Sequence, residues 1–480
     1  MRGGTWALSA QACRLFINLG ATLVIARLLT PGDFGLVAMV MAVVSFLALF
    51  REMGLAAATV QKEDLRDEHV NSMFWINGAA GCVLTVAVIG LSPLLSILYR
   101  EPRVTPIAMS ISACFFLNGW SVQHRALLRR RLQFGKLAGV DVLRPLVSSS
   151  VGIGMAATGC GVWSLAAMQI AGSLAETLAL WIACPWRPSR PRRTHGAGSM
   201  VRFGGFLTGF NLLNYFSRNA DRMLIGRVCG PAPLGLYSKA AHLLSMPLWF
   251  INTPMSSVAV PTLSRLQNDP DRYRRAYEKA MTVLAYSTTP ITVVLAALAT
   301  EVITLVLGSQ WVESSAVFAI LAIGALGRPL AGATGWVFIS LHRGRRMFLW
   351  AVISMPCYVA AYVVGIRWGI VGVAVGYAIC EHLLRWPLLF YAFHGTPIRV
   401  RGLVSACYRP IGMSVAALFV MLATREALLR FTSLSLVPRA AVTLGAGALL
   451  VACCVLVSRR VQQDFKELAD YRHSFRGAAA

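Results

Sequence analysis

Apolar stretches of about 20 residues recur along the whole chain, and this is the length that a helix needs to cross the hydrocarbon core of a bilayer. Only 14% of the 480 residues are charged, whereas a soluble domain carries about 25%. The pattern therefore predicts an all-α, polytopic membrane protein with about 14 transmembrane helices. Their approximate centres lie at residues 16, 44, 85, 115, 150, 173, 215, 248, 291, 325, 357, 380, 413 and 447.

The formal net charge of +25 is attributed to basic loops on one side of the membrane rather than to a nucleic-acid partner. Lys and Arg gather in loops on the cytoplasmic side of membrane proteins. With a cytoplasmic N-terminus, the loops assigned to the inside hold about 28 of the 45 Lys and Arg residues, and the opposite loops hold about 7. We therefore expect both the N- and C-termini to be cytoplasmic.

The second half of the sequence repeats the first. Residues 25–36 (IARLLTPGDFGL) align with 225–236 (IGRVCGPAPLGL), and residues 161–166 align with 369–374. Six spans separate equivalent positions, and because six is even, the two copies have the same orientation in the membrane. We expect two parallel six-helix lobes related by a pseudo-twofold axis, an arrangement typical of transporters. The expected divisions are an N-terminal lobe over 1–184, a basic cytoplasmic linker over 185–200, a C-terminal lobe over 201–394, two additional C-terminal helices over 403–458 and a cytoplasmic tail over 459–480.

The densest polar cluster within a predicted span lies in the seventh. Steps of three and four residues place its members on one helical face. A charged side chain at the bilayer centre costs about 2.5–3.5 kcal/mol, so such a face lines a cavity or pairs with a partner. Arg14 and Asn18 hold the equivalent place in the first span. The candidate substrate-binding residues are Arg14, Asn18, Asn214, Arg218, Asp221 and Arg222.

Two interpretations of this face stay open. One is a salt-bridge network between the lobes that holds one conformation, with Arg218 paired to Asp221. The other is a net positive cavity, whose guanidinium groups favour phosphate or pyrophosphate. Asp141 and Arg144 lie near a span end, so snorkelling or local pairing is expected to explain them. Further charges within spans are Glu176, Lys239, Arg328, Glu381 and Arg385.

The sequence contains no motif typical of an enzyme, a metal site or a cofactor site. It has no P-loop, no nucleophile elbow and no histidine at metal-ligand spacing from another ligand. The 11 cysteines are scattered through apolar segments without a C-x-x-C pair, which is typical of small buried hydrophobic residues. We therefore expect a membrane transporter without a cofactor or a metal, and not an enzyme.

Several sequence stretches are specific enough to suggest a family. They include residues 26–35 (ARLLTPGDFG), 123–128 (QHRALL), 161–165 (GVWSL) and the run from Arg202 to Tyr237. In them the chain resembles the Wzx-type polysaccharide flippases, and in particular the WzxC-like subgroup of the polysaccharide transporter family. This family belongs to the multidrug/oligosaccharidyl-lipid/polysaccharide exporter superfamily. The resemblance extends from the first span to about residue 390.

The resemblance implies a cavity that opens alternately to each side of a bacterial inner membrane. The usual cargo of such proteins is an undecaprenyl-pyrophosphate-linked oligosaccharide, moved from the cytoplasmic to the periplasmic leaflet. Membrane lipids, and the polysaccharide polymerase and glycosyltransferases of the same pathway, are the other partners that it implies; nucleic acid is not. Relatives carry a longer basic segment before the first span, which implies that this chain has a shortened start.

Two other functions stay open at this point. A small-molecule or drug exporter of the same superfamily would centre its cavity on carboxylates and aromatic rings, whereas arginine outweighs acid within the spans here. A membrane-bound polysaccharide polymerase or acyltransferase would need a large periplasmic loop or an acid–histidine site, and the loops assigned to the outside are short. The sequence leaves open the glycan, the coupling ion, the oligomeric state and the role of the last two helices.

Overall fold

The computed structural model describes residues 2–52, 59, 67–190, 215, 219–431, 434–457 and 462, and within these ranges it is helical without a strand. The all-α fold is therefore confirmed. The chain divides into two compact units, Met1–Ser238 and Lys239–Ala480. The domain boundaries expected from the sequence stay a prediction.

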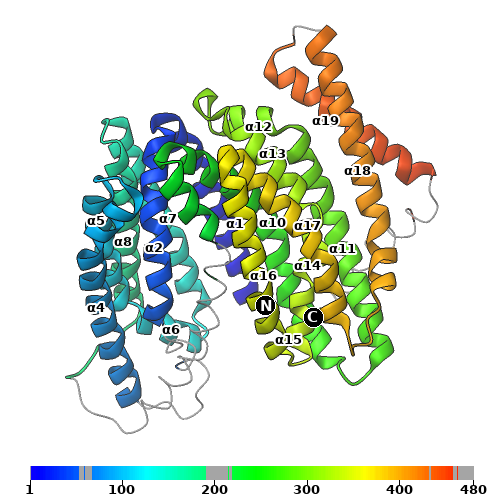
Figure 1. Cartoon of the computed structure of the whole chain (residues 1–480). Coiled ribbons are helices and arrows are strands. Elements are labelled where there is room, and N and C mark those ends of the chain that lie inside the picture. Colours follow the sequence, from blue (N-terminus) through cyan, green and yellow to red (C-terminus); the bar gives the residue numbers. More distant parts are fainter. Residues whose placement is uncertain are drawn as a thin grey trace. The chain divides into compact units, whose positions relative to one another are not determined.

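The first unit holds seven helices whose bounds are described in full (Figure 1). They are α1 (Arg2–Leu28), α2 (Pro31–Glu52), α4 (Asp67–Tyr99), α5 (Val104–Gly119), α6 (Val122–Arg130), α7 (Phe134–Ala157) and α8 (Val162–Ala183). Helix α4 packs along α5, α7 packs along α8, and α1 packs on α7. Helix α8 ends before the expected linker, whose described residues 185–190 are not helical.

Helix α10 (Pro231–Arg265) begins in the first unit and continues into the second. The second unit then contains α11 (Pro270–Ala297), α12 (Ala299–Val306), η1 (Ser309–Trp311), α13 (Ser314–Ala325), α14 (Arg328–Gly332), α15 (Thr334–Ser340), α16 (Gly344–Gly365), η2 (Ile366–Trp368), α17 (Gly369–Phe393), α18 (Val400–Phe431) and α19 (Leu436–Val457). Helix α11 packs along α18, α16 along α17, and α18 along α19.

Among the described residues, nine helical segments are long and apolar enough to cross a membrane, or ten if the bent pair in the second unit counts as one span. Thirteen of the 14 predicted centres lie inside helices with described bounds; the centre at 215 does not. The difference in number has identifiable sources. Helix α1 is not among the nine, α5 has 16 residues, and α16 and α17 count together as Gly344–Phe393. The total of 14 stays a prediction.

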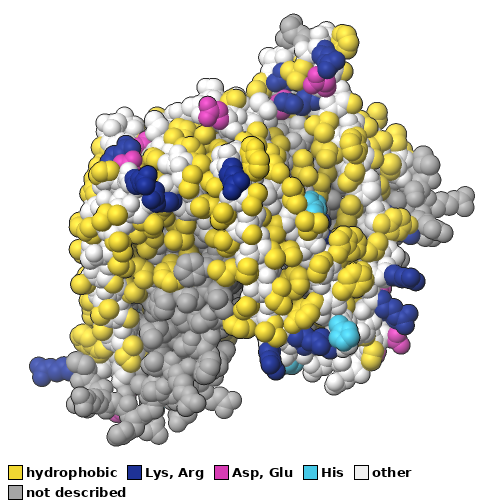
Figure 2. All heavy atoms as spheres, viewed as in Figure 1, with side chains coloured by type: hydrophobic (Ala, Val, Ile, Leu, Met, Phe, Trp, Pro, Cys, Tyr) yellow, Lys and Arg dark blue, Asp and Glu magenta, His cyan; other side chains and the backbone are white. Residues whose placement is uncertain are grey.

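Helix α4 of the first unit has large apolar residues on its outside and a close glycine contact with its neighbour. In α4, Ile97 and Val86 are about 70% exposed, while Gly81 lies so close to α5 that an added Cβ would come within 2.7 Å of the carbonyl oxygen of Phe115. Hydrophobic side chains cover most of the visible face of the described residues, and charged ones gather near helix ends (Figure 2). Exposed large apolar side chains together with close glycine contacts are typical of helices that face lipid and pack through small residues.

Local sequence signals explain where several helices begin. Pro31 occupies the first position of α2, and Thr30 and Asp33 cap it: the Thr30 hydroxyl donates to the Asp33 carboxylate over 2.7 Å. Before α11, Asp269 accepts a hydrogen bond from the Arg272 amide. Gly161 and Gly369, aligned in the sequence repeat, both have positive φ, +54° and +67°, at the starts of α8 and α17. The repeat match between residues 161–166 and 369–374 therefore begins, in both copies, with a glycine of positive φ at the start of a helix.

A buried histidine lies in an aromatic cluster at α6, a nine-residue helix that is too short to span a membrane. The His124 ring stacks on Trp181, with centroids 4.7 Å apart, and contacts Phe74 and Trp186 edge-on. Burial, and then the charge of Arg187, lower the pKa of His124 from 6.5 to about 4. The cluster is therefore built around a neutral imidazole at neutral pH.

We expect the first unit to lose stability between pH 6.5 and 4, because the unfolded chain binds a proton there that the folded chain does not. At about 1.4 kcal/mol per pKa unit, the full loss is about 3 kcal/mol. Unfolding followed by tryptophan fluorescence across this pH range measures it. His124→Phe removes the dependence, whereas His394→Phe, at an exposed position, keeps it. Equal acid sensitivity of wild type and His124→Phe would contradict the assignment.

Candidate functional site

The two copies of the repeated motif contact one another within the first unit. A Cβ added to Gly35 in α2 would overlap the carbonyl oxygen of Pro231, and one added to Gly235 in α10 would overlap the carbonyl oxygen of Pro31. The contact is reciprocal, because each copy presents its glycine to the proline of the other. Only glycine at both positions allows the backbones to approach this closely. The stronger match in the sequence repeat is therefore also a physical interface.

The candidate residues of the first span lie on α1. Arg14 and Asn18 are one turn apart and both are half-buried. Of the candidates in the seventh span, Asn214 and Arg218 lie outside the described residues. The structure therefore brings Arg14 and Asn18 to one face, and the predicted Arg218–Asp221 pair stays a prediction.

Asp221 and Arg222 have different neighbours. The Asp221 carboxylate is buried and accepts hydrogen bonds from the Tyr237 hydroxyl (2.9 Å) and the Arg222 amide (2.8 Å). The guanidinium of Arg222 is half-buried and donates to the Asn219 side-chain oxygen over 3.3 Å. Asp221 thus ties its segment to the start of α10. Of Asp221 and Arg222, only Arg222 has a partly accessible side chain.

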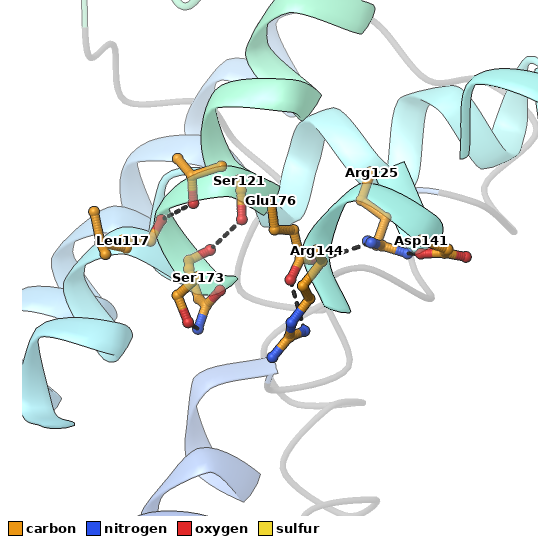
Figure 3. Close-up of polar contacts among 9 residues, drawn as sticks. Leu117, Ser121, Arg125, Asp141, Arg144, Ser173 and Glu176 are labelled. Atoms are coloured by element: carbon orange, nitrogen blue, oxygen red, sulfur yellow. Dashed lines mark hydrogen bonds and ion pairs between the residues drawn. The ribbon is translucent and has the colours of Figure 1, made fainter. Parts of the chain in front are cut away.

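A second polar group in the first unit links α6, α7 and α8 (Figure 3). Arg125 bridges two carboxylates, with 2.8 Å to Asp141 and 2.8 Å to Glu176. Glu176 also pairs with Arg144, over 2.6 Å. Of the two explanations expected for Asp141 and Arg144, local pairing is wrong: each pairs with a partner on another helix. Because the two positive and two negative charges balance, this group fastens the three helices together without a surplus charge for a ligand.

A third polar group lies in the second unit and was not expected from the sequence. Glu301 on α12 is 1% exposed and pairs with Arg425 on α18 (2.9 Å) and Arg439 on α19 (3.2 Å). It thereby ties both C-terminal helices to the rest of the unit. No sequence signal could have found this group, because its members are more than 120 positions apart except within the α18–α19 hairpin. In the described part of the chain, no group of three or more His, Cys, Asp or Glu residues could hold a metal ion.

Comparison with known families matches residues 24–316, more than half of the chain, to a model described as "Polysaccharide biosynthesis protein". The chain belongs to this polysaccharide biosynthesis protein family. Among curated members of similar sequence is the lipopolysaccharide biosynthesis protein WzxC of Escherichia coli, 22% identical over 79% of this chain and 78% of that protein. The teichuronic acid biosynthesis protein TuaB of Bacillus subtilis is 23% identical over 94% of this chain and 93% of its own. The resemblance to WzxC-like polysaccharide transporters is thereby confirmed.

Solved structures show which fold the polysaccharide biosynthesis protein shares. The lipid II flippase MurJ, in an inward closed conformation, superposes with a TM-score of 0.74 at 13% identity, covering 95% of this chain and all of that one. An inward-facing multidrug resistance MATE transporter superposes with a TM-score of 0.63 at 14% identity, covering 84% of this chain and 96% of that one. At these identities the likeness shows the fold alone.

Proposed function

We propose that this polysaccharide biosynthesis protein is a flippase that moves a lipid-linked oligosaccharide from the cytoplasmic to the periplasmic leaflet by alternating access. The observation that carries the proposal is the family match, which joins the chain to relatives named for the biosynthesis of surface polysaccharides. The likeness of its fold to the lipid II flippase MurJ supports the same step. In this proposal the protein is a transporter, not an enzyme, of a bacterial inner membrane, with both termini cytoplasmic.

We further propose that a cationic cavity holds the polyprenyl-pyrophosphate head group. Its residues are those expected from the sequence: Arg14, Asn18, Asn214, Arg218, Asp221 and Arg222. A guanidinium group suits this role, because it can donate two parallel hydrogen bonds to one phosphate. In this arrangement Asp221 positions Arg222, since its carboxylate ties the same turn to Tyr237. Partners such as a polysaccharide polymerase and glycosyltransferases follow from the pathway and belong to the proposal.

The test is reconstitution of the purified protein into vesicles with a fluorescent undecaprenyl-pyrophosphate oligosaccharide. The protein should accelerate movement of the label between leaflets. Arg222→Ala and Arg218→Ala should each slow it by roughly 10- to 100-fold, because a hydrogen bond to a charged group contributes about 1.5–3 kcal/mol. Arg367→Ala, at an exposed position of the second unit, serves as the control and should flip at the wild-type rate. No acceleration over empty vesicles rejects the function, and unchanged rates in both variants reject the cavity.

A further inference from the structure

A buried arginine on α17 has no part in the site proposed above. Arg385 is 8% exposed, although it lies two turns before the end of a membrane-spanning helix. One of its terminal nitrogens, Nη1, donates to Nδ1 of His382 over 2.8 Å. A buried guanidinium is costly unless its donors are paired, so the remaining nitrogens decide what the group is for.

The partner histidine is neutral, and its hydrogen bonds fix the tautomer. Nε2 of His382 lies 3.2 Å from the carbonyl oxygen of Ile323, which can only accept a hydrogen bond. Nε2 therefore carries the proton, and Nδ1 is left to accept from Arg385. The imidazole orients the guanidinium but supplies no negative charge to it.

The two remaining nitrogens of Arg385 form one edge. Nε and Nη2 are buried, and neither has a hydrogen-bond partner in the part of the chain that the structure describes. Their N–H groups are parallel, and this is the edge of a guanidinium that binds a carboxylate or phosphate through two bonds at once. The nearest acid in the sequence, Glu381, attracts the Arg385 guanidinium electrostatically, but the hydrogen bond that its carboxylate accepts comes from the Tyr358 hydroxyl over 2.7 Å.

The Arg385 guanidinium packs closely against the backbone of Gly327. A Cβ added to Gly327 would overlap the Cζ and Nη1 atoms of Arg385, so only glycine leaves room for the group. Gly327 lies where α13 ends and α14 begins, at a 53° bend. The next residue, Arg328, donates to the Tyr377 hydroxyl over 2.8 Å. Two arginines and one glutamate thus share this region, which leaves it with a surplus positive charge.

We propose that Arg385, seated on Gly327 and oriented by His382, binds one oxyanion of the phosphate class through Nε and Nη2. The site contains none of the residues of the proposed head-group cavity, so it stands or falls independently of the flippase function. Two sources present this chemistry: free inorganic phosphate, and the phosphate of a prenyl-linked molecule.

Equilibrium binding to the purified full-length protein tests the proposal, with radiolabelled inorganic phosphate in one arm and radiolabelled geranyl pyrophosphate in the other. Sodium chloride keeps the ionic strength equal throughout. We expect one saturable site per chain in at least one arm that remains when Arg222→Ala disables the proposed head-group cavity. Arg385→Lys, which keeps the charge but loses the paired edge, should weaken it by roughly tenfold or more. Gly327→Ala should do the same by displacing the guanidinium, while Arg367→Gln should bind as the wild type does.

The two arms distinguish the sources. Phosphate binding that depends on Arg385 identifies the free ion, and binding of the prenyl ligand alone identifies a lipid-borne group. If wild type binds neither, or if Arg385→Lys binds both as tightly as wild type, the proposal is overturned and the edge holds only water. Arg385→Gln, checked for a monodisperse elution profile, repeats the comparison without the charge. Because flipping is measured separately, failure here leaves the proposed function intact.

Discussion

Gly35→Ala is expected to abolish most flipping while leaving the protein in the membrane. The added methyl group would overlap the Pro231 carbonyl oxygen, so the two backbones must separate. Overpacking of this kind costs about 1–3 kcal/mol, and about 1.4 kcal/mol corresponds to tenfold in an equilibrium. Gly235→Ala should have the same effect, because its Cβ would overlap the Pro31 carbonyl oxygen in the same way. The vesicle assay gives the rate, and an immunoblot of the membrane fraction gives the abundance.

Gly90→Ala is the matched control for this prediction. Gly90 is a helical glycine of the same unit, and an added Cβ there would meet nothing within 4 Å. In a helix, alanine is favoured over glycine by up to about 1 kcal/mol, so this variant should fold at least as well as wild type. Wild-type flipping by both Gly35→Ala and Gly235→Ala would show that the close contact is not needed during transport.

Glu176→Gln is expected to destabilise the first unit by roughly 1–3 kcal/mol, because the acid is buried while its two arginine partners are partly exposed. Glu176 holds Arg125 and Arg144 at once, and its side chain is 9% exposed. Removing its charge leaves Arg144 without this carboxylate and Arg125 with Asp141 alone. The measurement is equilibrium unfolding in mixed detergent micelles, followed by tryptophan fluorescence, since Trp181 lies on the same helix.

The comparison for this prediction is Glu426→Gln. Glu426 pairs with Arg430 one turn along α18, and both side chains are more than half exposed. An exposed pair of this kind contributes less than about 1 kcal/mol. A double-mutant cycle between Glu176 and Arg125 should give a coupling of about 0.5–3 kcal/mol. A loss for Glu176→Gln no larger than that for Glu426→Gln would mean that the network does not fasten these helices.

The positions of most helices could be predicted from the sequence, because apolar length is nearly sufficient to define a membrane helix. Apolar length is not sufficient where a span is short or bent. Helix α5 has 16 residues, and the apolar segment centred near 325 is broken into α13, α14 and α15 around Gly327. A count of apolar residues does not distinguish a straight span from this one, which bends at Gly327, where the Arg385 guanidinium packs against the backbone.

The polar contacts were harder to predict, because their partners are distant in the sequence. Arg125 lies in the stretch 123–128 that carries the family resemblance, yet it pairs with Glu176, 51 positions away. Arg439 reaches Glu301 across 138 positions. Helical spacing identifies which residues share a face, as it did for Arg14 and Asn18. It does not tell which neighbouring helix that face meets, and packing decides that.

The reciprocal contact of the two glycine–proline motifs has a consequence for the origin of the chain. A patch in which each side presents the same residues to the other is the kind that two identical subunits make around a twofold axis. The internal interface therefore has the form of a former homodimer contact, now enclosed in one polypeptide. Duplication and fusion of a half-length gene would leave such a trace. Each glycine is then constrained twice, once by the packing of its own helix and once by its counterpart 200 residues away.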